Sequence, residues 1–375
     1  MKQTRKIVVC LLLVGILSLL WGCGGQETSG MEESTTQATV SDIFTVPETD
    51  PTETDATQET EDPMKELLKQ KFMMSLKVPG GMSYGFHGGE GTDLDSYYVY
   101  QGGELPIQLY MKADGFSDMG VGALIFLDGQ PQPYRTADEE NYSYMHTFYP
   151  EDDVPYVIDA YMIPVTGQAG DTLEIYTMCV AWPDYFLNDA PVAFQHTCGS
   201  TGGGMKVKFQ ADPPAQELPE PLYPVISCTT EFEDLESWEI TDWSTEDLRH
   251  KVEWEFTING IEAGGDLFGY SGEEPLTLRY EIWGGTAVEY GLILYIDNQP
   301  VCVDEEQLHS VELKNGKKTI IEVQVDMSGY DGSSVVYGVL AAKNFYSGGA
   351  NQIFIESRPP FYLCSSPTFD DLMGW

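Results

Sequence analysis

The chain has few positively charged residues. Its 375 residues include 19 Lys and Arg against 60 Asp and Glu, which gives a formal net charge of −41 at pH 7. Nucleic-acid recognition relies on a basic face, so no nucleic-acid partner is expected. Anionic lipid headgroups are excluded as direct ligands for the same reason. The acidic surface favours solubility and would also attract cations, calcium above all.

Motifs for metal binding and catalysis are also scarce. No C-x-x-C pair exists and the five histidines lack ligand spacing, so no zinc site is expected. The acidic stretches 90–95 and 326–331 carry oxygen ligands that suit calcium, but neither matches a defined calcium loop, and no cofactor is predicted. Residues 81–85 have the G-x-S-x-G spacing without the strand and helix that a nucleophile elbow requires. The chain is therefore not expected to be an enzyme.

Helical periodicity is nearly confined to residues 64–75, where a short helix is predicted. The rest of the chain alternates short apolar segments with Gly and Pro, as β-sandwiches do. In its first half the strands are expected at Tyr97–Tyr100, Ile107–Met111, Ala123–Leu127, Tyr142–Phe148, Val154–Ile163, Thr172–Ala181 and Met205–Phe209.

One stretch of the chain occurs twice. Residues 103–131 and 272–300 align without a gap at an offset of 169, with nine identical positions. Each copy reads as a strand of period two, a glycine-containing loop, an apolar run and a turn that begins at Asp128 or Asp297. The predicted fold is therefore all-β, with two tandem, related, antiparallel β-sandwich (Ig-like) domains.

The alignment continues beyond this hairpin, where residues 170–173 match 332–335 at an offset of 162. The expected organisation is a signal peptide (1–22), an acidic, threonine-rich, disordered tether (23–63), the short helix (64–75), a first β-sandwich (76–212), a proline-rich linker (213–224), a second β-sandwich (225–366) and a C-terminal tail (367–375). The tether is expected to be disordered because it is highly charged and has few large apolar groups.

The start of the chain has the pattern of a signal peptide. Three basic residues precede an apolar run at 7–20 that is short for a membrane span. The next residues, Leu20-Trp21-Gly22-Cys23, resemble the lipobox of bacterial surface lipoproteins. The resemblance covers the first 23 residues and implies that Cys23 is acylated (palmitate included) and becomes the mature N-terminus at the extracytoplasmic face of the cell membrane. An uncleaved signal-anchor is the alternative.

Five cysteines follow Cys23, and an odd number leaves at least one thiol unpaired or bonded to another chain. A bond between Cys179 and Cys198 would close a hairpin. A bond between Cys228 and Cys364 would join the first and last strands of the second sandwich. Buried free cysteines in the sandwich cores are the alternative.

Three tryptophans are candidates for ligand binding. Trp238, Trp243 and Trp283 lie in or beside expected loops, with acidic residues close by. An aromatic ring can stack on a sugar while carboxylates accept hydrogen bonds from its hydroxyls. The first two belong to an insertion, Thr229–His250, that only the second copy contains. Burial in the core is the alternative for all three.

The sequence thus predicts a membrane-anchored, extracytoplasmic lipoprotein that presents two β-sandwich domains for binding or adhesion at the cell envelope. The alternative is a glycan-binding or glycan-processing accessory lipoprotein. Its expected partners are the membrane, through the lipid anchor, and an envelope glycan or protein.

Overall fold

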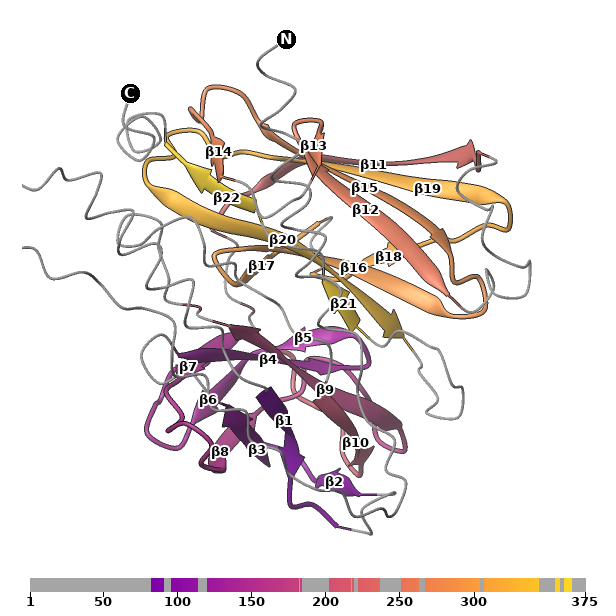
Figure 1. Cartoon of the computed structure of the whole chain (residues 1–375). Coiled ribbons are helices and arrows are strands. Elements are labelled where there is room, and N and C mark those ends of the chain that lie inside the picture. Colours follow the sequence, from indigo (N-terminus) through magenta and orange to yellow (C-terminus); the bar gives the residue numbers. More distant parts are fainter. Residues whose placement is uncertain are drawn as a thin grey trace, which may run out of the picture. The chain divides into compact units, whose positions relative to one another are not determined.

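The protein is described by a computed structural model, and every element of secondary structure among its described residues is a β-strand (Figure 1). The structure describes residues 82–90, 96–113, 120–181, 183, 202–216, 218, 222–236, 251–262, 267–303, 307–343, 355–357 and 361–365. Within these ranges no helix is long and apolar enough to cross a membrane. The predicted all-β class is confirmed. The lipobox, the tether and the helix predicted at 64–75 lie outside the described residues.

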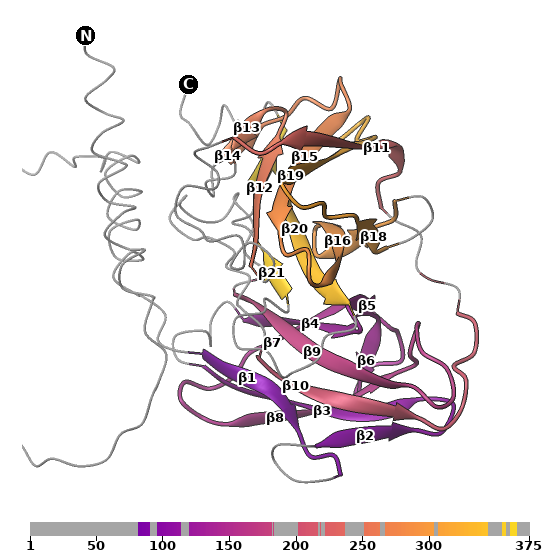
Figure 2. The same ribbon diagram turned by 90° about the vertical axis from the view of Figure 1, so that its right-hand side faces the viewer.

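The first ten strands form one sheet system, in the order β5-β4-β9-β10-β1-β3-β8-β6, with β2 paired to β10 and β7 to β4. Their bounds are β1 Met82–His87, β2 Tyr97–Tyr100, β3 Leu105–Ala113, β4 Val121–Leu127, β5 Gln130–Gln132, β6 Tyr134–Thr136, β7 Met145–Phe148, β8 Tyr156–Met162, β9 Thr172–Ala181 and β10 Gly202–Phe209. Figure 2 shows β4 and β9 in one layer and β3 and β8 in another. We call this set the first sandwich.

Alternation along the strands creates the core between these two layers. In β3 every second side chain is buried, from Leu105 through Leu109 to Ala113, while the intervening residues are at least partly exposed. This is the pattern of a strand with one face on a core. The buried set continues on the inner sides of β4 and β9, for example at Ile125 and Ile175.

The remaining strands form two further sheets, ordered β11-β19-β15-β12-β13 and β14-β22-β20-β16-β17, with β18 paired to β16 and β21 to β20. Their bounds are β11 Val225–Asp234, β12 Val252–Ile258, β13 Ile261–Glu262, β14 Leu267–Gly269, β15 Leu276–Gly284, β16 Glu289–Ile296, β17 Gln299–Val301, β18 His309–Val311, β19 Lys317–Val325, β20 Ser333–Lys343, β21 Ile355–Ser357 and β22 Phe361–Cys364. In Figure 1, β11, β19, β15 and β12 lie side by side in a layer apart from β20 and β16. We call this set the second sandwich.

The two sandwiches repeat one pattern of strand pairing. The ladder of β4 with β9 corresponds to that of β16 with β20, and β3 between β1 and β8 corresponds to β15 between β12 and β19. Each sandwich also has a parallel pair at the same place, β2 with β10 and β14 with β22. Leu109 and Leu278, matched by the sequence repeat, are 1% and 0% exposed. The pairing and the burial support the prediction of two copies of one fold.

The sequence alignment was wrong by one residue in the last part of the repeat. Leu127 pairs with Ile175 in the first sandwich, and its counterpart Ile296 pairs with Val336 in the second. The offset there is therefore 161, not 162. A slip of one residue moves every side chain of a strand to the opposite face, so only the corrected register matches Tyr176 with Tyr337.

The strands β4 and β16 are buried on both faces. All seven residues of β4 are buried, and seven of the eight in β16. The side chains of β4 and β9 that point away from the first core, Leu124, Phe126, Tyr176, Met178 and Val180, share one hydrophobic cluster with the second sandwich. Continuous apolar runs, rather than alternating ones, are typical of strands covered on both sides.

The repeated aspartates are turn residues, as predicted. Asp128 and Asp297 both have a φ of 50°, a left-handed conformation that Asp tolerates. The carboxylate of Asp297 accepts hydrogen bonds from the hydroxyl of Ser334 at 2.8 Å and the backbone N–H of Val335 at 3.0 Å. These bonds join the hairpin turn to the start of β20.

We predict that Gly338→Ala destabilises the protein by about 1–3 kcal/mol, the usual cost of overpacking a core. A Cβ at Gly338 would lie 2.4 Å from Cε1 of the Tyr280 ring on the facing sheet. Chemical denaturation measures the change, with Ser333→Ala in the same strand as the control. A Gly338→Ala variant as stable as the wild type would contradict the facing of β20 and β15.

Candidate functional site

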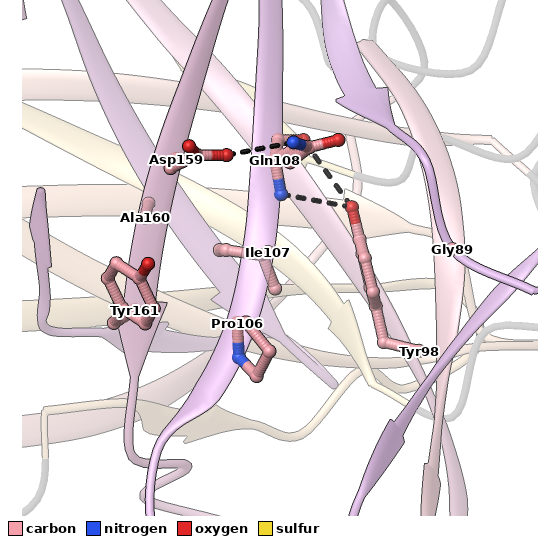
Figure 3. A pocket seen from close by; sticks show the side chains of 8 residues that line it. All are labelled: Gly89, Tyr98, Pro106, Ile107, Gln108, Asp159, Ala160 and Tyr161. Atoms are coloured by element: carbon pink, nitrogen blue, oxygen red, sulfur yellow. Dashed lines mark hydrogen bonds between the residues drawn. The ribbon is translucent and has the colours of Figure 1, made fainter. Parts of the chain in front are cut away.

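A pocket of about 240 Å³ opens on the outer face of the first sandwich (Figure 3). It is lined by Gly89, Tyr98, Pro106, Ile107, Gln108, Asp159, Ala160 and Tyr161. Ile107 and Ala160 are buried, whereas Pro106 and Asp159 are exposed and Gln108 and Tyr161 partly exposed. The alternation of β3 and β8 thus separates the lining residues that also belong to the core from those that face the solvent.

Strand register brings the pocket residues together. Gln108 on β3 lies opposite Asp159 on β8 and opposite His87 on β1. Two residues further along each strand, and therefore on the same face, Pro106 lies opposite Tyr161. Directly opposed residues are close enough for their side chains to interact. The sheet therefore carries a polar row, His87, Gln108 and Asp159, beside an apolar row, Pro106 and Tyr161.

Hydrogen bonds hold the polar row in place. The side-chain amide of Gln108 donates to Oδ1 of Asp159 at 2.8 Å. The hydroxyl of Tyr98 donates to the carbonyl of His87 at 2.7 Å and accepts from the backbone N–H of Gln108 at 3.2 Å. Burial raises the pKa of Tyr98, which therefore stays protonated as a donor. Asp159 is exposed, so its carboxylate remains accessible to a ligand.

A glycine pair allows the chain to approach the pocket closely. Gly88 and Gly89 follow β1 with φ values of +74° and +84°. A Cβ at Gly88 would lie 2.9 Å from Oε1 of Gln108. The backbone conformation therefore favours glycine at this position, and a side chain there would displace the amide of Gln108.

The ring of Tyr161 is supported by an ion pair at the edge of the sheet. The guanidinium of Arg135, on β6, lies 4.5 Å from the ring centroid of Tyr161. Its Nε and Nη2 donate to the two carboxylate oxygens of Glu104 at 2.7 and 2.8 Å. The hydroxyl of Tyr142 donates to the same carboxylate at 2.5 Å. A bidentate pair of this kind has a well-defined geometry, which fixes the guanidinium plane against the ring.

The ion pair changes the acidity of Glu104. The hydrogen bond from Arg135, followed by that from Tyr142, lowers the pKa of Glu104 from 4.5 to about 2. A carboxyl group whose pKa is lower in the folded than in the unfolded protein stabilises the fold fully at any pH above its unfolded-state pKa. This stabilisation is lost as the pH falls through the folded-state pKa.

We therefore predict that Glu104→Gln lowers the melting temperature at pH 7. The difference from the wild type should shrink as the pH falls from about 4.5 towards 2, where Glu104 itself becomes neutral. Thermal melts at a series of pH values test this. A difference that does not change with pH would show that the charge of Glu104 contributes nothing.

The tryptophans singled out from the sequence are not in this pocket. Trp283 lies within β15 and is 7% exposed, so the expectation of an exposed ring beside a loop was wrong. Trp238 and Trp243 lie outside the described residues. The predicted insertion loop Thr229–His250 begins instead as strand, because Thr229–Asp234 pairs with β19.

The second sandwich does not repeat the pocket chemistry. Thr277 occupies the position of Gln108 in the repeat and lies opposite Gln324 on β19. Its backbone N–H donates to the side chain of Asn259 at 2.9 Å. These counterparts are polar and include no aromatic ring, so these positions of the second copy lack the pocket's combination of a ring, an amide and a carboxylate.

The cysteine predictions have different outcomes. Cys179 is a free thiol, 1% exposed, on the inner face of β9, so its predicted bond to Cys198 is not formed; Cys198 lies outside the described residues. Burial raises the pKa of the Cys179 thiol, which keeps it protonated and unreactive. Cys228 and Cys364 lie in different sheets, on β11 and β22, and their bond stays a prediction.

The other motifs have structural roles where they are described. Ser83 of the G-x-S-x-G stretch lies within β1, opposite Lys112, rather than at a strand-to-helix turn. Asp326 accepts a hydrogen bond from the backbone N–H of Ser328 at 2.9 Å, which lowers its pKa. Across the described ranges, no group of three or more His, Cys, Asp or Glu side chains could hold a metal ion.

Comparison with known proteins identifies no family. No protein-family model matches the chain, and no curated protein matches it. Among solved structures, the C-terminal domain of the AgI/II polypeptide BspA from Streptococcus agalactiae covers 76% of this chain and 100% of its own, with 6% identity and a TM-score of 0.20. A protein named as a membrane anchored protein from Corynebacterium diphtheriae covers 76% and 59%, with 10% identity and a TM-score of 0.19. Similarity at this level carries no argument about function.

Proposed function

We propose that this chain is a lipid-anchored, extracytoplasmic binding protein whose first sandwich binds a neutral glycan in the pocket on β3 and β8. The observation that carries the proposal is the pairing of a partly exposed tyrosine with an ordered amide and carboxylate. Tyr161 stands beside Pro106, and Gln108 is hydrogen-bonded to Asp159 in the adjacent row. Binding, rather than catalysis, is the role proposed for them.

The chemistry of the two rows suits a sugar. A pyranose has an apolar face of C–H groups and a rim of hydroxyls. The ring of Tyr161 and the side chain of Pro106 offer a surface for the apolar face, as aromatic residues do in binding sites. The carboxylate of Asp159 and the amide of Gln108 then accept from and donate to the hydroxyls.

Strand order argues against a peptide held by strand addition. Such a peptide needs the free edge of a sheet. The pocket lies on β3, which is flanked by β1 and β8, and on β8, which is flanked by β3 and β6. Main-chain groups of these strands are therefore engaged within the sheet, so the ligand must be recognised by side chains.

The charge of the chain selects among glycans. The net charge of −41 repels anionic sugars, and Asp159 adds a carboxylate in the pocket itself. The nearby cation, Arg135, is paired with Glu104. Neutral sugars, including N-acetylated amino sugars, are therefore the expected ligands, and uronic or sialic acids are not.

Tyr161→Ala is expected to weaken glycan binding by about 1–3 kcal/mol, as the loss of an aromatic anchor typically does. Folding stability should fall by no more than about 1 kcal/mol, the usual contribution of an exposed cation–π contact such as that of the ring with Arg135. An array of neutral and acidic glycans, followed by calorimetry on the purified full-length protein, measures the loss.

Tyr161→Phe serves as the matched control, since it keeps the ring and removes only the hydroxyl. It should bind nearly as well as the wild type. The proposal fails if the wild-type protein retains no glycan on the array, or if Tyr161→Ala binds as tightly as Tyr161→Phe.

The anchoring part of the proposal rests on the lipobox-like stretch that ends at Cys23. Cys23→Ser removes the thiol that would be acylated. The variant should lose incorporation of a radiolabelled or clickable fatty acid and should appear in the soluble fraction or as unprocessed precursor. Labelling of Cys23→Ser equal to that of the wild type would contradict a lipid anchor at this residue.

A further inference from the structure

Beyond the pocket, the outer face of β3 and β8 carries apolar side chains. Val157 lies two residues before Asp159 on the same face of β8 and pairs with Tyr110 on β3. The exposed fraction of Val157 is 43%. Tyr110 is partly exposed. We call Val157 and Tyr110 the distal patch.

The distal patch is continuous with the pocket. β8 carries Val157, Asp159 and Tyr161 in succession on its outer face, and β3 carries Tyr110, Gln108 and Pro106 opposite them. A single exposed hydrophobic residue needs no explanation, but apolar side chains that continue a pocket extend the surface that a ligand can contact.

The spacing sets the size of the ligand. Tyr161 is four positions after Val157, and a strand rises ~3.4 Å per residue, so the two residues are about 13–14 Å apart along β8. This is longer than one sugar ring. A ligand that contacts both must therefore be a chain of several units.

We infer that the pocket and the distal patch form one binding strip along β3 and β8, which takes a linear neutral oligosaccharide rather than a single sugar. This inference rests on the proposed glycan-binding function and adds the length and direction of the ligand. Tyr161 and Pro106 contact one unit, Gln108 and Asp159 the hydroxyls next to it, and Tyr110 with Val157 a unit further along.

The charges around the distal patch favour this occupant over a second copy of the chain. Glu151, Asp152 and Asp153 border the patch and are exposed, and the cation beside them, Lys112, lies 3.1 Å from the carboxylate of Asp153. A second copy, also at −41, would bring like charges to this rim. A neutral oligosaccharide meets no such repulsion.

Calorimetry with chito- and cello-oligosaccharides of one to six units tests the inference on the full-length protein. Wild-type affinity should rise by about tenfold or more between the shortest and longest ligands that bind. In Val157→Ser, affinity for long ligands should fall to that for short ones, with short ligands unaffected. Tyr161→Ala should lose affinity at every length. Ile261→Ser, which replaces an equally exposed residue of the second sandwich, is the control and should behave as the wild type.

The outcomes separate the two proposals. Wild-type binding that is independent of ligand length, or an unchanged length dependence in Val157→Ser, overturns the extended strip and leaves glycan binding in place. Binding of no oligosaccharide in the series, together with an empty glycan array, overturns both. Sedimentation of the wild type as a dimer that Val157→Ser converts to a monomer would assign the distal patch to self-association instead, and would also overturn the inference.

Discussion

Burial of β4, β9, β16 and β20 on both faces is the constraint on which the rest of the structure depends. The inner side chains of each pair fill the core of their own sandwich, and the outer ones, such as Phe126 and Tyr176, join a single hydrophobic cluster with the second sandwich. A strand covered on both sides has no position at which a polar side chain reaches water. These sheets therefore tolerate little change in sequence. The two copies can differ on the solvent-facing side of the other layer of each sandwich.

That division explains where the candidate site lies. In the first sandwich, the layer of β1, β3, β8 and β6 has a core side and an outer side, and the outer side carries both the pocket and the distal patch. The corresponding outer side of the second sandwich carries ion pairs instead. Glu281 is paired with Arg279 at 2.9 Å and with Lys318 at 2.5 Å. The two copies thus share a core and differ on the surface, as expected when function resides in sites on a common fold.

Much of the fold could be predicted from the sequence. The bounds predicted for β2 and β9 match the structure, and the aspartates of the repeat were recognised as turn residues because Asp adopts positive φ readily. β1 was missed because Gly81 to Gly85 reads as a glycine-rich loop, and glycine weakens the signal of a strand. The candidate site was missed for a different reason. Gln108 and Tyr161 are ordinary outward-facing strand residues. The aromatic residues selected from the sequence for their nearby acidic residues were tryptophans, which do not line the pocket where they are described.

The sequence by itself determined the all-β class, the duplication and the faces of alternating strands such as β3 and β15, because a period of two follows from the geometry of one extended chain. It also contained the signal for the scaffold sheets, in the unbroken apolar runs of β4 and β16. Only the tertiary structure decided which strands are neighbours and in what register. Gln108 and Asp159 are 51 residues apart in the chain, and Glu104 and Arg135 are 31 apart. Their contacts depend on strand pairing between distant segments, and a one-residue slip in that pairing would place their side chains on opposite faces.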